Sequence, residues 1–336
     1  MIAHQSASLP FTRPTIVESL PLDELEPGRV HRLRLAMTQN ATGNETLVPV
    51  FVIRAEGDPS PVVGITAAIH GNELNGIRVV QELAASLARD PSAMRLGTII
   101  AVPLLNVPGY LNETRTFSDG VDLNRIMPGK PHGNESELYA HRIMELIIKR
   151  CDYLFDLHTA SFGRVNTHYV RCDLRSPTVM TLAALLEPQI ILHSPNSDGT
   201  LRGAAAQLGI EALTVEVGDP QRIQRGMVRE AYSGLTAALA HLGVLDPVDP
   251  HPEEELIKCA RSYWMYTDRG GLLHVLPSLG ERVKRGDEVA RLRDVWGDLV
   301  VRFYAPEDSV VIGKSTNPTA GAGSRVVHLG VEGDPV

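Results

Sequence analysis

The sequence has few cysteines and few aromatic residues, and it contains no long hydrophobic run. Only three cysteines occur in 336 residues, namely Cys151, Cys172 and Cys259. A set this sparse and widely spaced excludes a disulfide framework and a cysteine-rich metal site. No apolar stretch approaches the roughly 18 residues that a membrane span requires. We therefore expect a cytoplasmic protein without a membrane partner.

An excess of positive charge is also missing. Asp and Glu together number 40 and Lys and Arg 32, which gives a formal net charge of -8. This balance disfavours nucleic acid or an anionic membrane surface as a partner. The segment Met1 to Thr15 has no positive cluster followed by an apolar stretch, so it does not predict a signal peptide.

The sequence does have enough apolar residues for a sizeable core, at 43% hydrophobic content. Its length predicts a main domain and a smaller one. Prolines and acidic residues break all periodicity between Val244 and Glu254. We place a linker at residues 247–254, between a hydrolase domain of residues 1–246 and a C-terminal domain of residues 255–336.

Apolar strands alternate with amphipathic helices before this linker. The pattern predicts strands at 48–55, 61–69, 97–105, 153–158 and 211–217, and helices at 74–88, 135–150, 176–187 and 221–242. The nearly continuous apolar run 61–69 is typical of a strand buried on both faces. The alternation predicts an α/β fold with a mixed, largely parallel sheet flanked by helices.

The sequence pattern changes after the linker. Short strand-like pieces, separated by Gly, Pro and Asp, follow one another between Tyr263 and His328. They lie at 271–275, 289–292, 299–304 and 309–312. No long helix fits this stretch, so we predict a small all-β, barrel-like domain.

The tetrapeptide His-Gly-Asn-Glu occurs at residues 70–73 and again at residues 132–135. A histidine and a glutamate at this spacing can share a metal ion, although the spacing alone is weak evidence. The first copy ends a buried strand, at the place where open α/β sheets bind ligands. We expect Gly71 to allow a tight turn and Glu73 to lie in the first helical turn, where a carboxylate could instead serve only as a cap.

The second copy follows a proline-containing loop and has no strand before it. We interpret Asn134 and Glu135 as capping residues that begin the helix 135–150. A third pair with the same spacing, His251 and Glu254, falls in the linker, where we expect solvent exposure.

A catalytic zinc site needs three protein ligands and an open position for water. The best third ligand is His158, which ends the predicted strand 153–158. A single histidine at a strand end is more often a hydrogen-bonded core residue. Two strand-end histidines together with Glu73 could converge on one edge of the sheet, and this favours a metal site.

Two further segments carry polar residues suited to chemistry. Glu216 stands in an apolar strand, where a carboxylate is costly unless it is paired or functional, and burial raises its pKa as a general base requires. The alternative is a salt-bridged glutamate at a strand end. Asn124 and Arg125 place an amide beside a guanidinium, which suits a substrate carboxylate. Their alternative is an ordinary surface turn.

Four segments in this order resemble the succinylglutamate desuccinylase/aspartoacylase family, relatives of the zinc carboxypeptidases. They are His70-Gly-Asn-Glu73, Asp122-Leu-Asn-Arg125, Asp156-Leu-His158 and Glu216-Val-Gly218. The resemblance covers about residues 45–245, and the combination is far more specific than any one motif. It implies a zinc carboxypeptidase-like fold and one zinc ion per subunit, bound by His70, Glu73 and His158.

The resemblance also implies the activity. Such an enzyme removes the acyl group from an N-acyl amino acid by means of metal-activated water. Glu216 matches the glutamate that activates the water and later protonates the leaving amine, and Arg115 resembles the arginine that polarises the scissile carbonyl. Asn124 and Arg125 match the pair that holds a substrate carboxylate. Asp156 could orient a ligand or be a structural strand residue.

Two other functions stay open from the sequence. A metallocarboxypeptidase acting on a short peptide uses the same metal set, and a non-catalytic metal-binding or assembly protein would require the site to be vestigial. The C-terminal unit is similar to lipoyl/biotinyl β-barrels, but Glu307 and Asp308 stand where a modifiable lysine is expected. We therefore expect this unit to be a lid over the cleft or a contact in a homo-oligomer.

Overall fold

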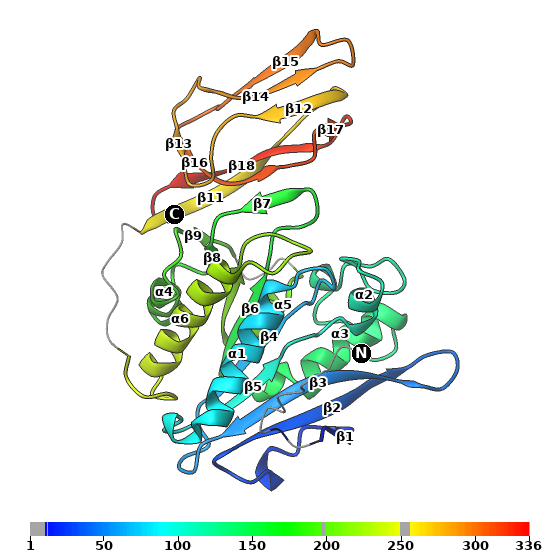
Figure 1. Cartoon of the computed structure of the whole chain (residues 1–336), viewed down its shortest axis with the longest axis vertical. Coiled ribbons are helices and arrows are strands. Elements are labelled where there is room, and N and C mark those ends of the chain that lie inside the picture. Colours follow the sequence, from blue (N-terminus) through cyan, green and yellow to red (C-terminus); the bar gives the residue numbers. More distant parts are fainter. Residues whose placement is uncertain (1–10, 12, 196–198, 249–255, 336) are drawn as a thin grey trace, which may run out of the picture.

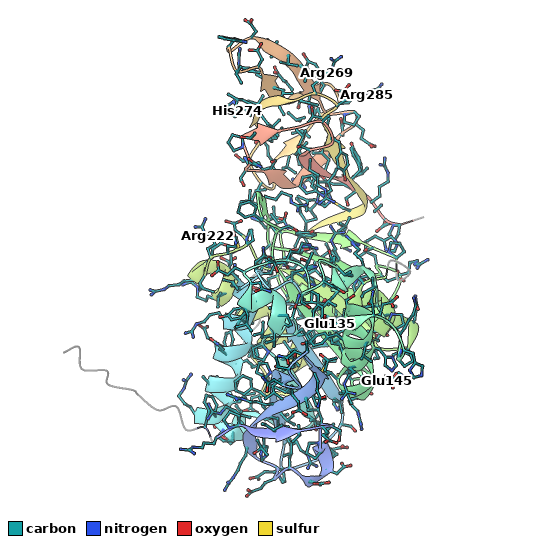
Figure 2. All side chains as sticks on the ribbon, turned by 90° about the vertical axis from the view of Figure 1, so that its right-hand side faces the viewer. Glu135, Glu145, Arg222, Arg269, His274 and Arg285 are labelled. Atoms are coloured by element: carbon teal, nitrogen blue, oxygen red, sulfur yellow. The ribbon has the colours of Figure 1, made fainter. Side chains whose placement is uncertain are left out.

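Figure 1 shows the computed structural model, which describes residues 11, 13–195, 199–248 and 256–335. The predicted linker from residue 249 onward, with His251 and Glu254, lies outside the described residues. The molecule is elongated, with an α/β body at one end and an all-β unit at the other, as the quarter turn in Figure 2 also shows.

One mixed sheet extends through the whole molecule. Its strands, in spatial order, are β1 (Thr15–Val17), β2 (Arg29–Gln39), β3 (Glu45–Arg54), β5 (Thr98–Val102), β4 (Val62–Ala67), β6 (Tyr153–His158), β10 (Glu211–Glu216), β8 (Tyr169–Cys172), β9 (Ile190–His193), β11 (Ile257–Tyr266), β18 (Arg325–Glu332), β16 (Ser309–Ser315) and β13 (Arg282–Val283), while β7 (Arg164–Asn166) pairs with β16. The central strands β5, β4, β6 and β10 are parallel to one another. Antiparallel pairs on both sides of this block make the sheet mixed, and the predicted fold class is confirmed.

Helices cover both faces of the central sheet. They are α1 (Asn75–Arg89), α2 (Val107–Leu111), α3 (Glu135–Leu146), α4 (Pro177–Leu185), α5 (Leu201–Gln207) and α6 (Arg225–His241). Short 3₁₀ turns lie at η1 (Leu22–Glu24), η2 (Pro91–Ala93), η3 (Leu123–Arg125) and η4 (Ile148–Arg150). Helices α1, α4 and α6 share one hydrophobic core with the sheet, whereas α3 and α5 share the core on the other face.

A second, smaller sheet completes the C-terminal unit. Its antiparallel strands are β15 (Leu299–Tyr304), β14 (Glu288–Arg293), β12 (Gly271–Val275) and β17 (Thr319–Ala320). Its apolar side chains, such as Leu273 and Leu292, pack against Val311 and Leu329 of the main sheet. No helix occurs among the described residues after Leu256, as the sequence predicted.

Strand β11 joins the two units by hydrogen bonds. It runs parallel to β9 and antiparallel to β18, so the main sheet continues without a break from the body into the C-terminal unit. The domain boundary at residues 247–254 therefore stays a prediction, and the C-terminal unit is held at the edge next to β9. In the described part of the chain, no helix has the length and apolar character needed to cross a membrane.

The second His-Gly-Asn-Glu is a helix start, as predicted. Asn134 caps α3, since its Oδ1 accepts a hydrogen bond from the backbone N–H of Glu137 at 2.9 Å. Oε2 of Glu137 in turn accepts from the N–H of Asn134 at 3.1 Å, which makes a capping box. Glu135 is the first helical residue and His132 is exposed. These residues begin a helix and lie outside the candidate metal cluster described below.

One prediction near the first copy is wrong. Helix α1 begins at Asn75, so Glu73 lies in the turn before the helix and not in its first turn. The turn is closed by a hydrogen bond from the N–H of Glu73 to the carbonyl of His70 at 3.1 Å. The helical spacing of apolar residues located α1 but could not show that a separate turn precedes it.

Candidate active site

Three parallel strands bring their polar ends to one edge of the sheet. Strands β6 and β10 pair so that His158 is opposite Glu216 and Asp156 is opposite Thr214. Because side chains alternate along a strand, Asp156 and His158 point to the same face, as does Glu216 on the neighbouring strand. Strand β4 ends beside β6, and the turn that follows it carries His70 and Glu73.

The turn after β4 is tightly constrained. A Cβ atom at Gly71 would lie 2.0 Å from the carbonyl carbon of Gly109, so only glycine allows the backbone of α2 to approach this closely. Ala68, just before the turn, has φ 52°, a left-handed conformation that costs of order 1–3 kcal/mol outside glycine. The surrounding structure therefore fixes where His70 and Glu73 stand.

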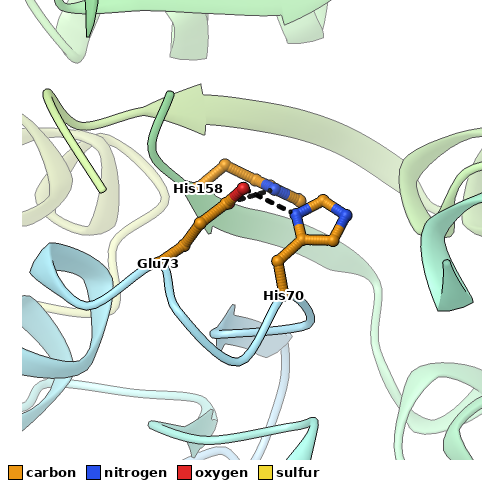
Figure 3. A group of neighbouring side chains, drawn as sticks. All are labelled: His70, Glu73 and His158. Atoms are coloured by element: carbon orange, nitrogen blue, oxygen red, sulfur yellow. Dashed lines mark hydrogen bonds and ion pairs between the residues drawn. The ribbon is translucent and has the colours of Figure 1, made fainter. Parts of the chain in front are cut away.

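His70, Glu73 and His158 form a buried cluster (Figure 3). Nδ1 of His70 is 2.9 Å from Oε1 of Glu73, and Nδ1 of His158 is 3.0 Å from Oε2 of the same carboxylate. One ligand atom from each residue lies within 4.8 Å of the others. Within the described residues, no other group of three His, Cys, Asp or Glu side chains is arranged to hold a metal ion.

The far nitrogen of each histidine ring contacts a second carboxylate. Nε2 of His70 is 3.0 Å from Oδ1 of Asp122, and Nε2 of His158 is 2.8 Å from Oδ2 of Asp156. Asp156 is itself fixed by a hydrogen bond from Oγ1 of Thr66 at 2.7 Å. Carboxylates in this position orient metal-binding histidines. Of the two roles considered for Asp156, orienting a ligand fits its contacts.

This donor set fits a zinc ion. Two histidines and a glutamate are a known catalytic zinc combination. Both rings turn Nδ1 toward Glu73, and Nδ1 of His70 is buried without a hydrogen-bond partner, because its contact with Oε1 lacks hydrogen-bond geometry. An unpartnered buried nitrogen beside a carboxylate is what metal coordination would satisfy.

The charges of the cluster depend on one another. Burial would raise the pKa of Glu73, but His70 and His158 hold it well below its usual range. Burial would lower the pKa of His158, but Asp156 and Glu73 raise it well above its ordinary value. Burial would also raise the pKa of Asp122, but His70 and Arg115 hold it well below its usual range. The cluster therefore keeps ionised carboxylates facing its histidines.

Asp122 was not assigned a role from the sequence, and its contact with His70 gives a prediction. Replacing Asp122 with Asn should weaken zinc binding about 10- to 100-fold, because the carboxylate no longer fixes the His70 ring. Competition with a zinc-chelating dye measures this. Asp119→Asn, at an exposed position nearby, is the matched control. Equal zinc affinity of Asp122→Asn and the control would contradict the role.

Arg115 lies directly against the cluster. Its Nη1 donates to Oε1 of Glu73 and to Oγ of Ser161, both at 2.7 Å, and its Nε donates to Oδ2 of Asp122 at 3.1 Å. No acceptor for Nη2 is found among the described residues. The guanidinium is thus fixed at the cluster by Nε and Nη1, and Nη2 can still donate hydrogen bonds to a ligand.

Glu216 occupies the end of β10 beside the cluster. Its side chain is 12% exposed and accepts long hydrogen bonds from the hydroxyl of Tyr169 (3.3 Å) and from Nδ2 of Asn166 (3.4 Å). Burial raises its pKa, with Glu73 adding to the effect and with His158 and Arg171 opposing it. Its ion pair with Arg171, at 4.0 Å, is at the limit of contact. The carboxylate of Glu216 therefore has only long hydrogen bonds and one distant ion pair.

Asn124 and Arg125 lie in η3, directly after Asp122, whose carboxylate contacts His70. Oδ1 of Asn124 accepts a hydrogen bond from the backbone N–H of Leu201 at 2.7 Å, which leaves its NH₂ group for a ligand. Arg125 is exposed, and no carboxylate partner for it is found among the described residues. Both residues line the cavity described next.

All the residues predicted from the sequence to form the site line one cavity of about 400 Å³. The sequence did not indicate its other wall, which includes Asn166, Tyr169 and Arg171 from the body and Ser262, Tyr263, Trp264, Arg325 and His328 from the C-terminal unit. The C-terminal unit therefore forms one side of the cavity, while its role as a lid or as a contact in a homo-oligomer stays a prediction. Arg171 lies in the four-residue strand β8, which is too short for a polarity pattern to reveal it.

Comparisons with known proteins agree with this geometry. Residues 59–242, more than half of the chain, match the family model described as the succinylglutamate desuccinylase/aspartoacylase catalytic domain. The N-alpha-acetyl-L-2,4-diaminobutyric acid deacetylase of Halomonas elongata is 24% identical over an alignment of 312 residues that covers 89% of each chain.

Solved structures share the fold over nearly the whole chain. The product-bound ectoine utilization protein EutE from Ruegeria pomeroyi has a TM-score of 0.82 at 22% identity, covering 93% of this chain and 97% of that one. A succinylglutamate desuccinylase from Silicibacter has a TM-score of 0.82 at 23% identity, covering 96% of this chain and 100% of the other. With its fold, its His-Glu-His cluster and the match of residues 59–242, the chain belongs to the succinylglutamate desuccinylase/aspartoacylase family.

Proposed function

We propose that this protein is a zinc-dependent deacylase that hydrolyses the amide bond of an N-acyl amino acid. The observation that carries the proposal is the buried His70–Glu73–His158 cluster, which opens on the same cavity as Glu216. The Halomonas relative is named as a deacetylase of an N-acetyl amino acid, which supports this substrate class. Family membership supports the reaction type.

The metal would be held by Nδ1 of His70, Nδ1 of His158 and the carboxylate of Glu73. The chemistry that zinc supplies at such a site is Lewis-acid polarisation of a carbonyl oxygen and acidification of a water molecule. Asp122 and Asp156 keep the two rings oriented for this purpose. One zinc ion per subunit is expected.

Glu216 is proposed as the proton carrier. Its carboxylate stands next to the cluster with a raised pKa and weak hydrogen bonds, so it can accept a proton from the attacking water. The same oxygen can later give this proton to the nitrogen of the leaving amino acid. The low exposure of the side chain keeps competing solvent away from the proton.

Two positively charged groups would position the substrate. Nη2 of Arg115 is proposed to donate a hydrogen bond to the carbonyl oxygen as negative charge develops on it. The guanidinium of Arg125 and the NH₂ group of Asn124 would hold the carboxylate of the amino acid. A substrate without this carboxylate should lose a charged hydrogen bond worth about 1.5–3 kcal/mol, or roughly 10- to 100-fold in kcat/KM.

The test is a substrate panel on chelator-treated and zinc-reloaded protein. N-acetyl amino acids should release free amino acid only after zinc is restored, and their α-carboxamide analogues should react at the lower rate given above. Release of primary amines measures both. Preferential cleavage of short peptides at the C-terminus would indicate a metallocarboxypeptidase instead. Absence of bound metal together with absence of hydrolysis would leave a non-catalytic protein.

A further inference from the structure

Two side chains donate hydrogen bonds to the carboxylate of Glu216, and both stand where the body meets the C-terminal unit. Nδ2 of Asn166 donates to Oε2 at 3.4 Å, and the hydroxyl of Tyr169 donates to Oε1 at 3.3 Å. Asn166 ends β7, and Tyr169 begins β8 three residues later. The elements that fix these two donors therefore also influence where the carboxylate of Glu216 stands.

Strand β7 takes its position from the C-terminal unit. Among the described strands it pairs only with β16, and in Figure 1 it lies between the body and that unit. The register places Asn166 opposite Gly313. Directly after β7, the N–H of Thr167 donates to the carbonyl of Ile312 at 2.9 Å. A segment of the body that carries one donor to Glu216 is thus attached to a strand of the other unit.

Tyr169 is held by the same unit. Its side chain is 2% exposed and belongs to a small hydrophobic cluster that includes Cys259 of β11 and Ile312 of β16. Its ring lies edge-on to the ring of His328 in β18, with centroids 6.4 Å apart. Both donors to Glu216 are therefore fixed by strands of the C-terminal unit, although Glu216 itself belongs to the body.

The contact between Asn166 and Gly313 leaves no room for a side chain at position 313. A Cβ atom at Gly313 would lie 2.4 Å from Oδ1 of Asn166 and 3.0 Å from the carbonyl oxygen of Val165. Only glycine allows a backbone to come this close to its neighbour. The amide of Asn166 thus has its oxygen against the backbone of Gly313, while its nitrogen faces Glu216.

An added side chain at position 313 would displace β7 more easily than β16. Strand β16 pairs on its other edge with β18, where Gly313 is opposite His328. Val311 and Ile312, just before Gly313, are fully buried. Strand β7 has only three residues. The expected response to a Cβ at position 313 is therefore a shift of Asn166 away from Glu216.

We propose that Gly313 is a positioning residue, which acts through Asn166 on Glu216. Because Gly313 has no side chain, β16 can approach β7 and hold the amide of Asn166 against the carboxylate. The inference rests on the proposed function, in which Glu216 carries the proton. Gly313 does not line the cavity, so it affects the reaction only through its neighbours. The C-terminal unit then orients the proton carrier, besides forming one side of the cavity.

The kinetic test replaces Gly313 with alanine in the zinc-loaded enzyme, with the fastest N-acetyl amino acid as substrate. This variant should lower kcat about 10- to 100-fold, because a reacting group displaced by about 1 Å has an effect of this size. KM and zinc content should stay nearly unchanged, since neither the cavity lining nor the candidate metal cluster is altered. Asn166→Ala, which removes the donor and leaves β16 intact, should lower kcat to a similar extent.

The double variant Gly313→Ala/Asn166→Ala tests whether Gly313 acts through Asn166. With Oδ1 of Asn166 gone, the added Cβ loses its closest contact, so the double variant should be no slower than Asn166→Ala alone. If Gly313→Ala does not fold, the double variant should fold for the same reason. Gly321→Ala is the matched control and should keep the wild-type kcat, because a Cβ there meets nothing within 4 Å.

Four outcomes would overturn the positioning role. They are a kcat of Gly313→Ala equal to that of the control, effects that multiply in the double variant, a double variant that does not fold, and a raised KM at unchanged kcat in Asn166→Ala. The last result would make Asn166 a contact of the substrate.

Crystal structures of the wild type and of Gly313→Ala separate this proposal from the proposed function. The distance between Nδ2 of Asn166 and Oε2 of Glu216 should lengthen beyond hydrogen-bond range in the variant, while the candidate metal cluster should be the same in both. If no amide is hydrolysed but this shift is seen, the deacylase function fails and the positioning by Gly313 stands. If amides are hydrolysed but Gly313→Ala is as fast as the control, the positioning fails and the deacylase function stands.

Discussion

Replacing His70 with alanine is expected to remove zinc from the protein and to reduce amide hydrolysis to background, while replacing His132 with alanine should change neither. Both histidines begin the same tetrapeptide, so each variant is the natural control for the other. His70 contributes a buried Nδ1 to the cluster, whereas His132 is exposed in the loop before α3.

The expected loss is large because the cluster has only three protein ligands. Removing one leaves Glu73 and His158, and it also leaves Asp122 without the ring it contacts. Loss of the metal removes several kcal/mol of charge stabilisation in the transition state, which corresponds to at least about 10³-fold in rate. Elemental analysis after gel filtration gives the zinc content, and initial rates of amine release give the activity.

Two results would contradict the assignment of the first copy. Stoichiometric zinc in His70→Ala would mean that the metal is bound elsewhere, and loss of zinc in His132→Ala would mean that the loop before α3 contributes a ligand. Thermal denaturation of both variants shows whether a lost activity reflects unfolding. His158→Ala should behave like His70→Ala, because its Nδ1 faces the same carboxylate.

The residues of the His70–Glu73–His158 cluster, which could hold a metal ion, were predictable because strand ends are visible in a sequence. His70 and His158 each end an apolar run, and the carboxyl ends of parallel strands meet at one edge of the sheet. Glu216 was visible for a related reason, since a carboxylate in an apolar strand is costly unless it has a function. The structure brings these residues to one cavity, while their catalytic roles stay a proposal.

The surroundings of the cluster were not predictable in the same way. Asp122 contacts a histidine 52 positions earlier, and the path of the loop between them decides this contact. The short strands β8 and β9 give no periodic signal of their own, because four residues are too few for one. Yet these strands pair with β10 and β11 and so set the position of the C-terminal unit.

The sequence does not predict which residues of the C-terminal unit line the cavity. The all-β character of this unit followed from its short apolar pieces and turns. That Trp264 and Arg325 line the cavity depends on β11 joining the edge of the main sheet beside β9, a long-range pairing without a local signature. The cavity of a catalytic domain that matches a family can therefore be lined in part by residues outside the matched region of residues 59–242.

Replacing Glu216 with glutamine is expected to lower kcat by about 10²- to 10⁴-fold and to leave the zinc content unchanged. The amide cannot accept a proton from the attacking water, yet it keeps the shape of the side chain and can still accept hydrogen bonds from Tyr169. Glu216 lies outside the cluster of ligand atoms, so metal binding should not depend on it. Glu211→Gln, at the other end of β10, is the matched control and should keep the wild-type rate.

The pH dependence of the same variant separates a proton carrier from a merely structural carboxylate. Burial raises the pKa of Glu216, so in the wild type the fraction of reactive carboxylate falls as the pH decreases through that raised value, and kcat/KM should fall with it. The glutamine variant has no such group, and this acidic limb should be absent from its residual rate. A near-normal rate in Glu216→Gln, or an unchanged acidic limb, would assign the proton transfer to another residue. The expected combination is a low rate, an unchanged zinc content and a residual rate that does not fall at acidic pH. A purely structural role of Glu216 cannot produce this combination.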